Sequence, residues 1–336
     1  MRILVTGGAG YIGSKVCHDL LNKKHKVYVL DNLSTGYKKL IPKKAIFFFG
    51  DILNKKRVIS IIKKNNINAV MHLAASLSVE ESERKPKKYF SNNVIGTKKL
   101  LQACSLCNIK YFIFSSTCAV YGNVNKRLKE NHATNPKSVY AKTKLQGELL
   151  IKDFAKKNNF YYAILRYFNV AGADLKNNIG CINQNNQLIK NLCGCIKNKN
   201  YKLKIYGNSY KTKDGTCVRD YIHLNDISKI HILSLNNLKK LKKSFLINCG
   251  YGFGYSVLDI IKKFEKILKI KILKIFCKNR PGDISSAVND PSTMRKQLKI
   301  NFNKNALEQI IRSAIKWESK NMHDKKDLLR LKQQHS

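Results

Sequence analysis

The chain of 336 residues is 43% hydrophobic, enough to build the core of one large two-lobed unit or of two modest domains. Arg2 leads directly into an apolar segment with none of the features of a secretory signal peptide. No uninterrupted apolar run approaches the roughly 20 residues that span a bilayer. The sequence therefore predicts a cytoplasmic protein without a membrane partner.

The formal net charge of +43 could indicate a nucleic acid or an anionic membrane as the partner. The lysines, however, are scattered over all expected surfaces, and they accompany many asparagines and isoleucines, as in Asn65-Asn66-Ile67-Asn68. Because the codons of these three amino acids are all rich in A and T, a biased genome accounts for the three enrichments together. We therefore expect no specific nucleic-acid partner, although the overall field should attract anionic substrates.

The ten cysteines raise the question of a metal site or a disulfide framework. Cys104 and Cys107 have CxxC spacing, but they fall on an amphipathic helical pattern, and no second pair or spaced histidine pair accompanies them. Cys193 and Cys195 are likewise isolated. We expect reduced, partly buried thiols and predict no metal site.

A glycine-rich segment, Thr6-Gly7-Gly8-Ala9-Gly10-Tyr11-Ile12-Gly13, follows a short apolar strand at residues 3–5 and precedes a helical pattern. Such a turn brings a pyrophosphate to the N-terminus of a helix, where free N–H groups and the helix dipole stabilise its charge. A second strand, residues 26–30, ends in Asp31. A carboxylate there accepts hydrogen bonds from ribose hydroxyls and repels a 2′-phosphate, so NAD is favoured over NADP.

Strands and helices continue to alternate along the first half of the chain. Further strands are predicted at residues 45–49, 69–73, 111–114 and 161–166, and helices at about 56–65, 89–107 and 139–158. Buried strands joined by helices are typical of a doubly wound parallel α/β sheet of the Rossmann type. We expect residues 1–168 to form this NAD-binding domain.

The second half, residues 169–336, has a less regular rhythm and is expected to form a smaller C-terminal substrate-binding lobe. Helices are predicted near residues 258–268 and 306–320, and some segments should return to the sheet. Ligands of such folds lie beyond the carboxyl ends of the strands. Residues 7–13, Asp31, Asp51, Ala74-Ala75 and residues 115–117 all fall at those ends, so they should line one crevice.

Tyr140 and Lys144 lie four residues apart, on one face of a helix that follows the strand ending in Thr117. The ordinary pKa of tyrosine, near 10, is too high for a base at neutral pH. A nearby ammonium group and an oxidised nicotinamide ring would lower this pKa. The phenolate could then take a proton from a sugar hydroxyl while hydride leaves the same carbon for the cofactor. Thr117 could bridge that hydroxyl and the phenol.

Further motifs occur along the chain. They are Asp31-Asn32-Leu33-Ser34, Gly50-Asp51-Ile52, His72-Leu73-Ala74-Ala75, Asn92-Asn93-Val94, Leu165-Arg166-Tyr167-Phe168-Asn169, Val218-Arg219-Asp220-Tyr221 and Arg280-Pro281-Gly282-Asp283. With the glycine-rich turn and the Tyr140/Lys144 pair, this set resembles the extended short-chain dehydrogenases/reductases and, within them, the UDP-glucose 4-epimerases (UDP-galactose 4-epimerases). The resemblance covers residues 1 to about 320.

The resemblance implies reversible 4-epimerisation of UDP-glucose and UDP-galactose through a transient 4-keto sugar, with tightly bound NAD. The catalytic residues would be Tyr140, Lys144 and Thr117. The implied cofactor contacts are Gly7, Gly10, Tyr11, Ile12, Gly13, Asp31, Asn32, Asp51, Ile52, Leu73, Ala74, Ala75, Asn92, Ser115, Tyr140, Lys144 and Tyr167. The implied substrate contacts are Thr117, Tyr140, Asn169, Gln187, Leu188, Tyr206, Arg219, Arg280 and Asp283. A homodimer through residues 89–107 and 139–157 would also be expected.

Two departures from the family pattern bear on function. Lys15 stands where many epimerases carry histidine. Ala287 stands where some relatives place a bulky tyrosine that narrows the sugar pocket, so UDP-GlcNAc and UDP-GalNAc are possible further substrates.

Other reaction classes were weighed. A sugar-nucleotide 4,6-dehydratase needs an Asp-Glu pair after the hydroxyl residue, and here Cys118-Ala119 follow Thr117. A net dehydrogenase would release NADH. A 4-epimerase of another UDP-sugar, such as a uronate, and a non-catalytic nucleotide-binding protein stay open as alternatives.

Overall fold

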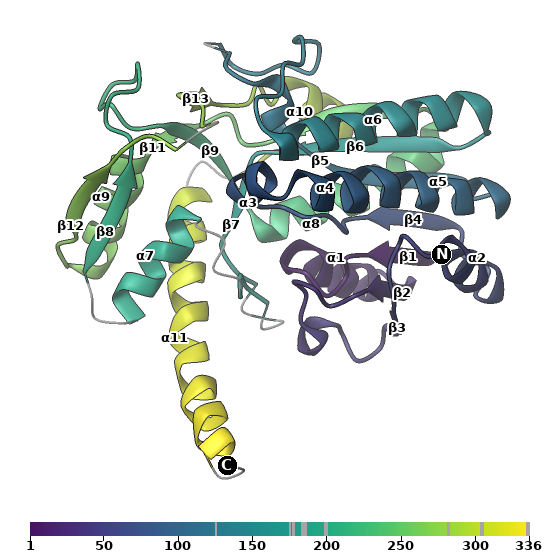
Figure 1. Ribbon diagram of the computed structural model, residues 1–336, viewed down its shortest axis with the longest axis horizontal. Helices are drawn as coiled ribbons and strands as arrows, with labels where there is room; N and C mark the ends of the chain where they lie inside the picture. Colours follow the sequence, from purple (N-terminus) through teal and green to yellow (C-terminus); the bar gives the residue numbers. More distant parts are fainter. Residues whose placement is uncertain are drawn as a thin grey trace.

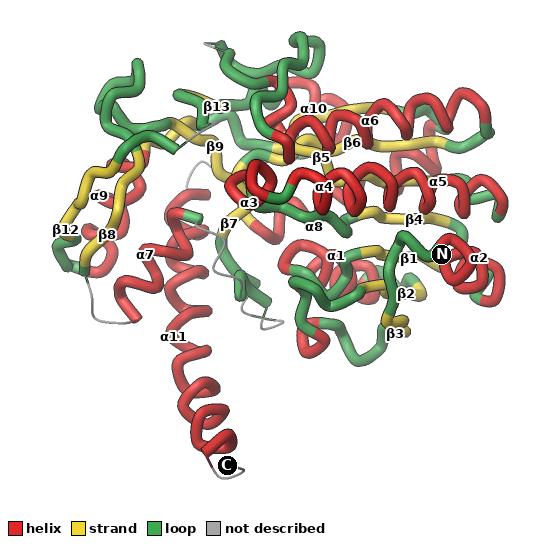
Figure 2. Tube along the Cα trace, viewed as in Figure 1, coloured by secondary structure: helices red, strands yellow, loops and turns green. Residues whose placement is uncertain are grey.

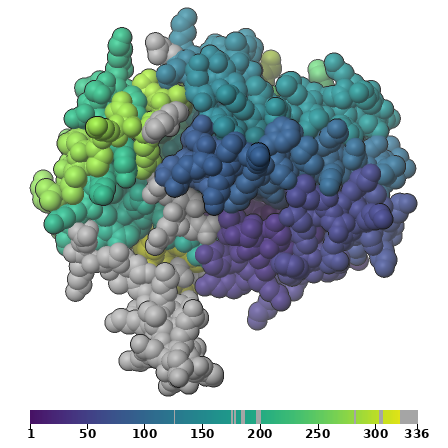
Figure 3. All heavy atoms as spheres, viewed as in Figure 1, coloured from purple at the N-terminus to yellow at the C-terminus, as the bar shows by residue number. Residues whose placement is uncertain are grey.

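The structure, a computed structural model, describes residues 1–124, 126–174, 176, 179–182, 187–197, 201–280, 283–302 and 306–333. A large sheet with helices on both faces forms one part of the molecule, and a smaller group of strands and helices lies beside it (Figure 1). In the space-filling view the N-terminal half, in purple and blue, packs directly against the green second half (Figure 3).

The large sheet has seven strands in the order β10-β6-β5-β4-β1-β2-β3. The strands are β1 (Arg2–Thr6), β2 (Lys26–Asp31), β3 (Ile46–Phe49), β4 (Ala69–His72), β5 (Tyr111–Thr117), β6 (Tyr161–Tyr167) and β10 (Phe245–Cys249). Every neighbouring pair is parallel. The predicted doubly wound parallel sheet is therefore confirmed, and β10 shows that the second half of the chain contributes its edge strand.

Two hydrophobic cores lie on the two faces of this sheet. Successive residues of a strand point to opposite faces, so Ile3 and Val5 of β1 pack into one core and Leu4 into the other. Helices α1 (Tyr11–Asn22) and α8 (Leu224–Leu241) cover the first face. Helices α2 (Lys55–Lys64), α5 (Gly96–Leu106) and α6 (Val139–Lys157) cover the second.

The helix predicted at residues 89–107 is interrupted. The segment consists of α4 (Pro86–Tyr89), a π-helical turn η2 (Phe90–Ile95) and α5, preceded by the short α3 (Val79–Arg84). A π-helical turn inserts an extra residue into the helical ladder and occurs often at functional sites. Here it carries Asn92 and Asn93, whose side chains reach back to the loop after β4.

The smaller lobe is organised around β9 (Val218–His223), which pairs with β7 (Asn169–Ala171), β11 (Gly254–Ser256) and β13 (Ser286–Ala287). A separate parallel pair is formed by β8 (Lys202–Tyr206) and β12 (Leu273–Cys277). The helices of this lobe are α7 (Leu188–Lys197), α9 (Val257–Leu268) and α11 (Ala306–Gln333) (Figure 2). Helix α10 (Ser292–Leu298) instead packs against β10 and α8 of the larger part.

None of the ten cysteines, all of which lie within the described residues, forms a disulfide bond. Within the described ranges, no cluster of side chains could hold a metal ion. None of the helices in the described part of the chain combines the length and the apolar character needed to cross a membrane.

Candidate active site

The glycine-rich turn after β1 brings three backbone segments into close contact. Gly7 has φ +76°, and a Cβ at this residue would lie 2.5 Å from the backbone nitrogen of Ala74. A Cβ at Gly13 would lie 2.1 Å from the carbonyl oxygen of Gly7. Helix α1 starts after Gly10, which offers no side-chain cap, and its first turn has no acidic residue. The positive end of α1 is therefore open to an anion.

Asp31 ends β2 beside this turn. Its Oδ2 accepts the backbone N–H of Ala9 (2.9 Å), and its Oδ1 accepts that of Leu33 (2.8 Å). Burial raises the pKa of Asp31, and the two N–H groups oppose that shift. Each carboxylate oxygen keeps a lone pair for a further donor, such as a ribose hydroxyl. Asn32 donates to Oδ2 of Asp51 (2.8 Å), which links the ends of β2 and β3.

The loop after β4 is held between the sheet and the π-helical turn. Leu73 donates its N–H to the Thr6 carbonyl (3.0 Å), and Ser76 donates its N–H to Oδ1 of Asn93 (2.8 Å). The same Asn93 donates to the hydroxyl of Thr143 on α6 (3.1 Å). Asn92 donates to the Ser76 hydroxyl (3.4 Å). The predicted cofactor contacts Leu73, Ala74, Ala75 and Asn92 are thereby fixed relative to α6.

Helix α6 places Tyr140 and Lys144 next to the end of β5. Its N-terminus is held from outside, because Ser82 and Glu83 of α3 accept the backbone N–H groups of Tyr140 (3.1 Å) and Val139 (2.8 Å). The hydroxyl of Thr117 forms a hydrogen bond with the Tyr140 side chain. The structure therefore brings the predicted Thr117, Tyr140 and Lys144 together.

The protein surroundings keep Tyr140 protonated. Burial raises the pKa of Tyr140 to about 12, and the hydrogen bond with Thr117 only partly opposes this. Burial lowers the pKa of Lys144 to about 7, opposed by the Glu148 carboxylate. The Lys144 ammonium also lies 4.4 Å from the centre of the Phe114 ring. The expectation of a lowered Tyr140 pKa is thus not met by the polypeptide's own groups, because burial outweighs the hydrogen bond.

A buried ion pair between Glu148 and Arg166 lies next to Lys144. Glu148, one helical turn after Lys144, is fully buried and accepts two hydrogen bonds from Arg166 of β6, at 2.9 and 2.6 Å. The Arg166 guanidinium lies 4.6 Å from the centre of the Tyr121 ring, and the Tyr121 hydroxyl donates to Asn248 of β10 (2.8 Å). This chain of contacts joins α6 to three strand ends.

A second group of polar residues lies in the smaller lobe. The Arg280 guanidinium stacks 3.9 Å from the centre of the Tyr206 ring, at the end of β8. Arg219 of β9 forms an ion pair with Asp283. Four of the predicted substrate contacts are therefore brought together as two pairs, each containing a guanidinium.

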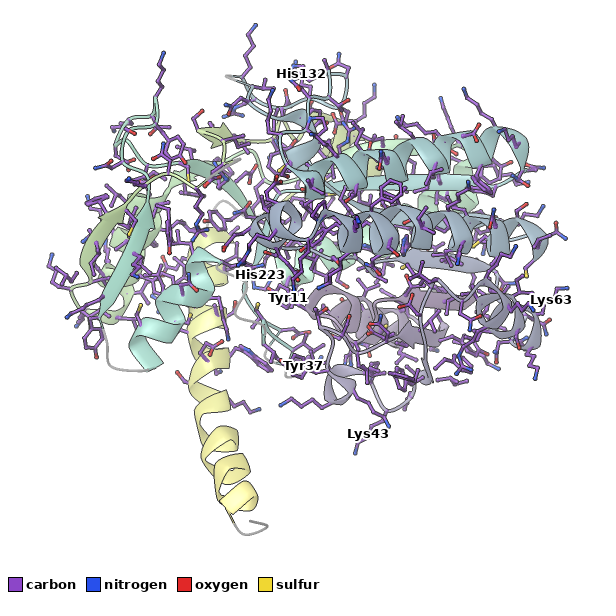
Figure 4. All side chains as sticks on the ribbon, in the orientation of Figure 1. Tyr11, Tyr37, Lys43, Lys63, His132 and His223 are labelled. Atoms are coloured by element: carbon purple, nitrogen blue, oxygen red, sulfur yellow. The ribbon has the colours of Figure 1, made fainter. Side chains whose placement is uncertain are left out.

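The two lobes meet at the N-terminus of α1. The Tyr11 hydroxyl donates to the Gly172 carbonyl (2.6 Å), and Lys15 pairs with Asp174 (2.7 Å) as well as with Asp19 (2.6 Å). Figure 4 shows Tyr11 close to His223 at this junction, while Lys43 and Lys63 lie at the periphery. Lys15, one of the departures from the family pattern, thus forms one ion pair across the junction, with Asp174, and one within α1, with Asp19.

Three hydrophobic residues next to Thr117 and Arg219 pack in one cluster. Cys118 follows Thr117, Phe168 follows Tyr167, and Ala287 lies in β13 opposite Arg219; the three share one buried cluster. Since these residues directly adjoin Thr117 and Arg219, the cluster forms a hydrophobic wall beside both groups.

The remaining predicted residues are less central. Asn169 forms a hydrogen bond with Tyr221 in the neighbouring strand. Gln187 lies beside Tyr11 on a cavity of about 20 Å³, just before Leu188 begins α7. The Tyr167 hydroxyl contacts His231 of α8 at 2.6 Å. Ile12, Ile52 and Ser115 lie at the carboxyl edge of the sheet or just beyond it. Pro281 and Gly282 of the last motif lie outside the described residues.

The sequence model of the NAD dependent epimerase/dehydratase family matches residues 3–250. The UDP-glucose 4-epimerase of Lactobacillus helveticus is 40% identical over 94% of this chain and 97% of that protein. The chain belongs to this epimerase family.

Solved structures of family members superpose closely on the chain. One is the UDP-glucose-4-epimerase from Stenotrophomonas maltophila with bound NAD and formylated UDP-arabinopyranose, at a TM-score of 0.92 and 32% identity, covering 96% of this chain and 99% of that one. Another is the UDP-Glc/GlcNAc 4-epimerase from Campylobacter jejuni, at a TM-score of 0.82 and 37% identity, covering 95% and 99%. The fold is therefore that of the epimerases throughout.

Sequence reasoning missed several residues of this epimerase site. Phe168 stands in a motif that was recognised, but only the structure places its ring in the wall beside Cys118 and Ala287. Glu148 could have been found, because its spacing of four from Lys144 puts both on one helical face. Ser82 and Glu83 carry no such signal, since their contact with α6 spans more than fifty residues of chain.

Replacing Glu148 by glutamine should strongly destabilise the fold, because it leaves the buried Arg166 without a counter-charge. Breaking such a pair costs about 3–5 kcal/mol. We expect urea titration to show a loss of that size in the free energy of unfolding. The double variant Glu148→Gln, Arg166→Met should regain most of it, since neither member of the pair is then left as an uncompensated buried charge. A loss below about 1 kcal/mol, typical of exposed pairs, would contradict this account.

Proposed function

We propose that this chain is an NAD-dependent UDP-glucose 4-epimerase that interconverts UDP-glucose and UDP-galactose through a transient 4-keto sugar. The observation that carries the proposal is the hydrogen bond between Thr117 and Tyr140 at the end of β5, with Lys144 one helical turn further along α6. The activity named for the relatives supports the same assignment.

The residues at the carboxyl edge of the sheet fit NAD. Gly7 and Gly13 have no room for a side chain, whereas a Cβ at Gly10 would meet only the Gly7 oxygen, at 3.2 Å. Backbone approach to a pyrophosphate is thus open at the uncapped end of α1, and Asp31 would accept the ribose hydroxyls. When bound, NAD would supply a hydride acceptor and the positive charge of its oxidised nicotinamide ring.

Tyr140 would act as the general base. Thr117 would orient the 4-hydroxyl of the sugar, and the phenolic oxygen of Tyr140 would take its proton. Lys144 would hold the nicotinamide ribose, and its positive charge would favour the ionised form of Tyr140, the phenolate. Burial in the polypeptide raises the pKa of Tyr140 to about 12. Groups bound in the site must therefore supply further positive charge to lower this pKa. Tyr140 would return the proton to O4 when the other epimer forms. Because the hydride would also be returned to C4, no net oxidant would be consumed.

The guanidinium groups of the smaller lobe would hold the UDP moiety. Arg219 and Arg280 can each offer several N–H donors to diphosphate oxygens. Tyr206 would contribute an aromatic face, and Asn169, Gln187, Leu188 and Asp283 the remaining contacts. In this division residues 1–168, joined by β10 and α8, would bind NAD, and residues 169–336 would mainly bind the UDP-sugar.

Incubation of the purified protein with UDP-galactose, without added NAD, tests the proposal by NMR. We expect conversion to a UDP-glucose/UDP-galactose mixture with no release of NADH. Tyr140→Phe should lose at least about 100-fold in turnover, the usual contribution of a positioned acid–base group, while retaining its nucleotide. Tyr111→Phe, at the opposite end of β5, is the matched control. An unchanged spectrum even with added NAD would instead favour another UDP-sugar or a non-catalytic role.

We further propose that the sugar pocket admits N-acetylated UDP-hexosamines. Ala287 is 2% exposed and lies in the wall with Cys118 and Phe168. Its single methyl group would take up less space beside the sugar than the tyrosine of some relatives, which would favour acceptance of a 2-acetamido group. The Campylobacter jejuni structure, a UDP-Glc/GlcNAc 4-epimerase, supports such breadth within the family.

Ala287→Tyr should narrow this specificity. The larger ring would fill the space beside the sugar, so we expect the ratio of UDP-GlcNAc to UDP-glucose turnover to fall by at least about tenfold, as a steric change in one pocket can achieve. Ala287→Ser is the control for a change at this residue without bulk. An unaltered ratio in Ala287→Tyr would show that this residue does not gate the pocket.

We also propose a cytoplasmic homodimer. Leu106 of α5 and Leu149 of α6 are 61% and 56% exposed, and the two helices pack side by side on one face. Burial of such side chains against a second copy would remove apolar surface from water. Sedimentation equilibrium should give twice the chain mass of 38.4 kDa, and Leu149→Glu should shift it toward the monomer. A wild-type monomer at micromolar concentration would exclude the dimer.

A further inference from the structure

Tyr210 lies on the loop that joins β8 to β9, in a fixed conformation. Its N–H donates to the Gly215 carbonyl (2.9 Å), and its own carbonyl accepts the N–H of Thr212 (2.7 Å). The Tyr210 ring packs on Gly207, where a Cβ would come within 2.4 Å of the ring carbon Cε2. Gly207 also has φ +91°, so glycine is required both for the turn and for the close approach of the ring.

The hydroxyl of Tyr210 is buried, and it has no hydrogen-bond partner in the described part of the chain. A buried donor left without a partner lowers stability because it has lost its hydrogen bonds to water, so such groups are rare and call for a physical reason. Among the described residues of this loop, no other buried side-chain nitrogen or oxygen lacks a partner; for example, Thr216 donates both its N–H and its hydroxyl to Asp214. Within this loop, the unpaired hydroxyl therefore belongs to Tyr210 alone.

The surroundings of this hydroxyl contain the two guanidinium pairs of the smaller lobe. Gly207, against which the Tyr210 ring packs, also adjoins the Asn279 side chain, and Arg280 follows Asn279 to stack on Tyr206. Arg219, Arg280 and Asp283 all act electrostatically on Tyr210, and burial raises its pKa, so the group is a neutral O–H donor at physiological pH. A donor beside two cations suits an anionic oxygen.

We propose that Tyr210 is a further substrate-binding residue, whose hydroxyl donates a hydrogen bond to a diphosphate oxygen of the UDP moiety. This inference rests on the proposed function, because it assumes that UDP lies between Arg219 and Arg280. Tyr210 is absent from the substrate contacts that the family motifs imply. The bound diphosphate accepts a hydrogen bond from the donor that has no partner among the described residues. The site thereby gains selectivity for a phosphate-bearing ligand.

Calorimetric binding of UDP and uridine to the wild type, Tyr210→Phe and Tyr201→Phe tests this assignment. Tyr201→Phe is the matched control, because that tyrosine is 41% exposed just before β8. A hydrogen bond to a charged group is worth about tenfold in affinity. We expect Tyr210→Phe to bind UDP about tenfold more weakly, with uridine binding unchanged. In turnover, the KM for UDP-galactose should rise by a similar factor at constant kcat, as expected for an interaction present in ground and transition states alike.

Stability separates a binding role from a purely structural one. Because Tyr210→Phe removes a buried group that has no partner, the melting temperature without ligand should be equal to or above that of the wild type. Equal UDP affinity in wild type and Tyr210→Phe, or an equal loss for uridine and UDP, would overturn the assignment to the diphosphate. If the wild type itself neither binds UDP nor turns over UDP-galactose, the proposed function fails, and that result is distinct from a failure of Tyr210 alone.

Discussion

The parallel direction of all seven strands is the constraint on which the site depends. Because the carboxyl ends of parallel strands lie at one edge, the residues that follow β1, β2, β4, β5 and β6 are neighbours although the chain separates them widely. At this edge the turn after β1 and the loop after β4 are in direct backbone contact, as the close approach of Gly7 to Ala74 shows. A side chain at either Gly7 or Gly13 would force the turn away from the loop after β4, and the N-terminus of α1 would lose its position.

The second organising element is β9, which pairs with three strands of the smaller lobe. It carries Arg219 in the same register as Ala287 of β13, and it brings both to the wall that Cys118 and Phe168 form at the ends of β5 and β6. Contacts at Tyr11 and Lys15 then join the lobes on the opposite side of the junction. The guanidinium pairs and the Thr117–Tyr140 pair are therefore held by different sheets, yet both adjoin the wall formed by Cys118, Phe168 and Ala287.

Burial determines the protonation of Tyr140 and Lys144 beside this wall. Burial shifts Tyr140 toward its protonated form and Lys144 toward its neutral form. Glu148 opposes the shift of Lys144 and forms a buried ion pair with Arg166. In the function that we propose, a positive charge entering this site would lower the pKa of Tyr140, and ligand binding would thereby generate the base.

The sequence by itself determined the sheet, the glycine-rich turn, Asp31 and the Thr117, Tyr140 and Lys144 set, because these depend on local periodicity and on spacing along one helix or one turn. It also indicated the family, through motifs that are each contiguous. Only the tertiary structure decided that residues 89–107 contain a π-helical turn, that Phe168 packs in one cluster with Ala287, and that Ser82 and Glu83 hold the start of α6. It also decided that the hydroxyl of Tyr210 is buried with no partner among the residues that the structure describes. Each of these depends on contacts between residues far apart in the chain, and their geometry is set by how sheets and helices pack rather than by any local pattern.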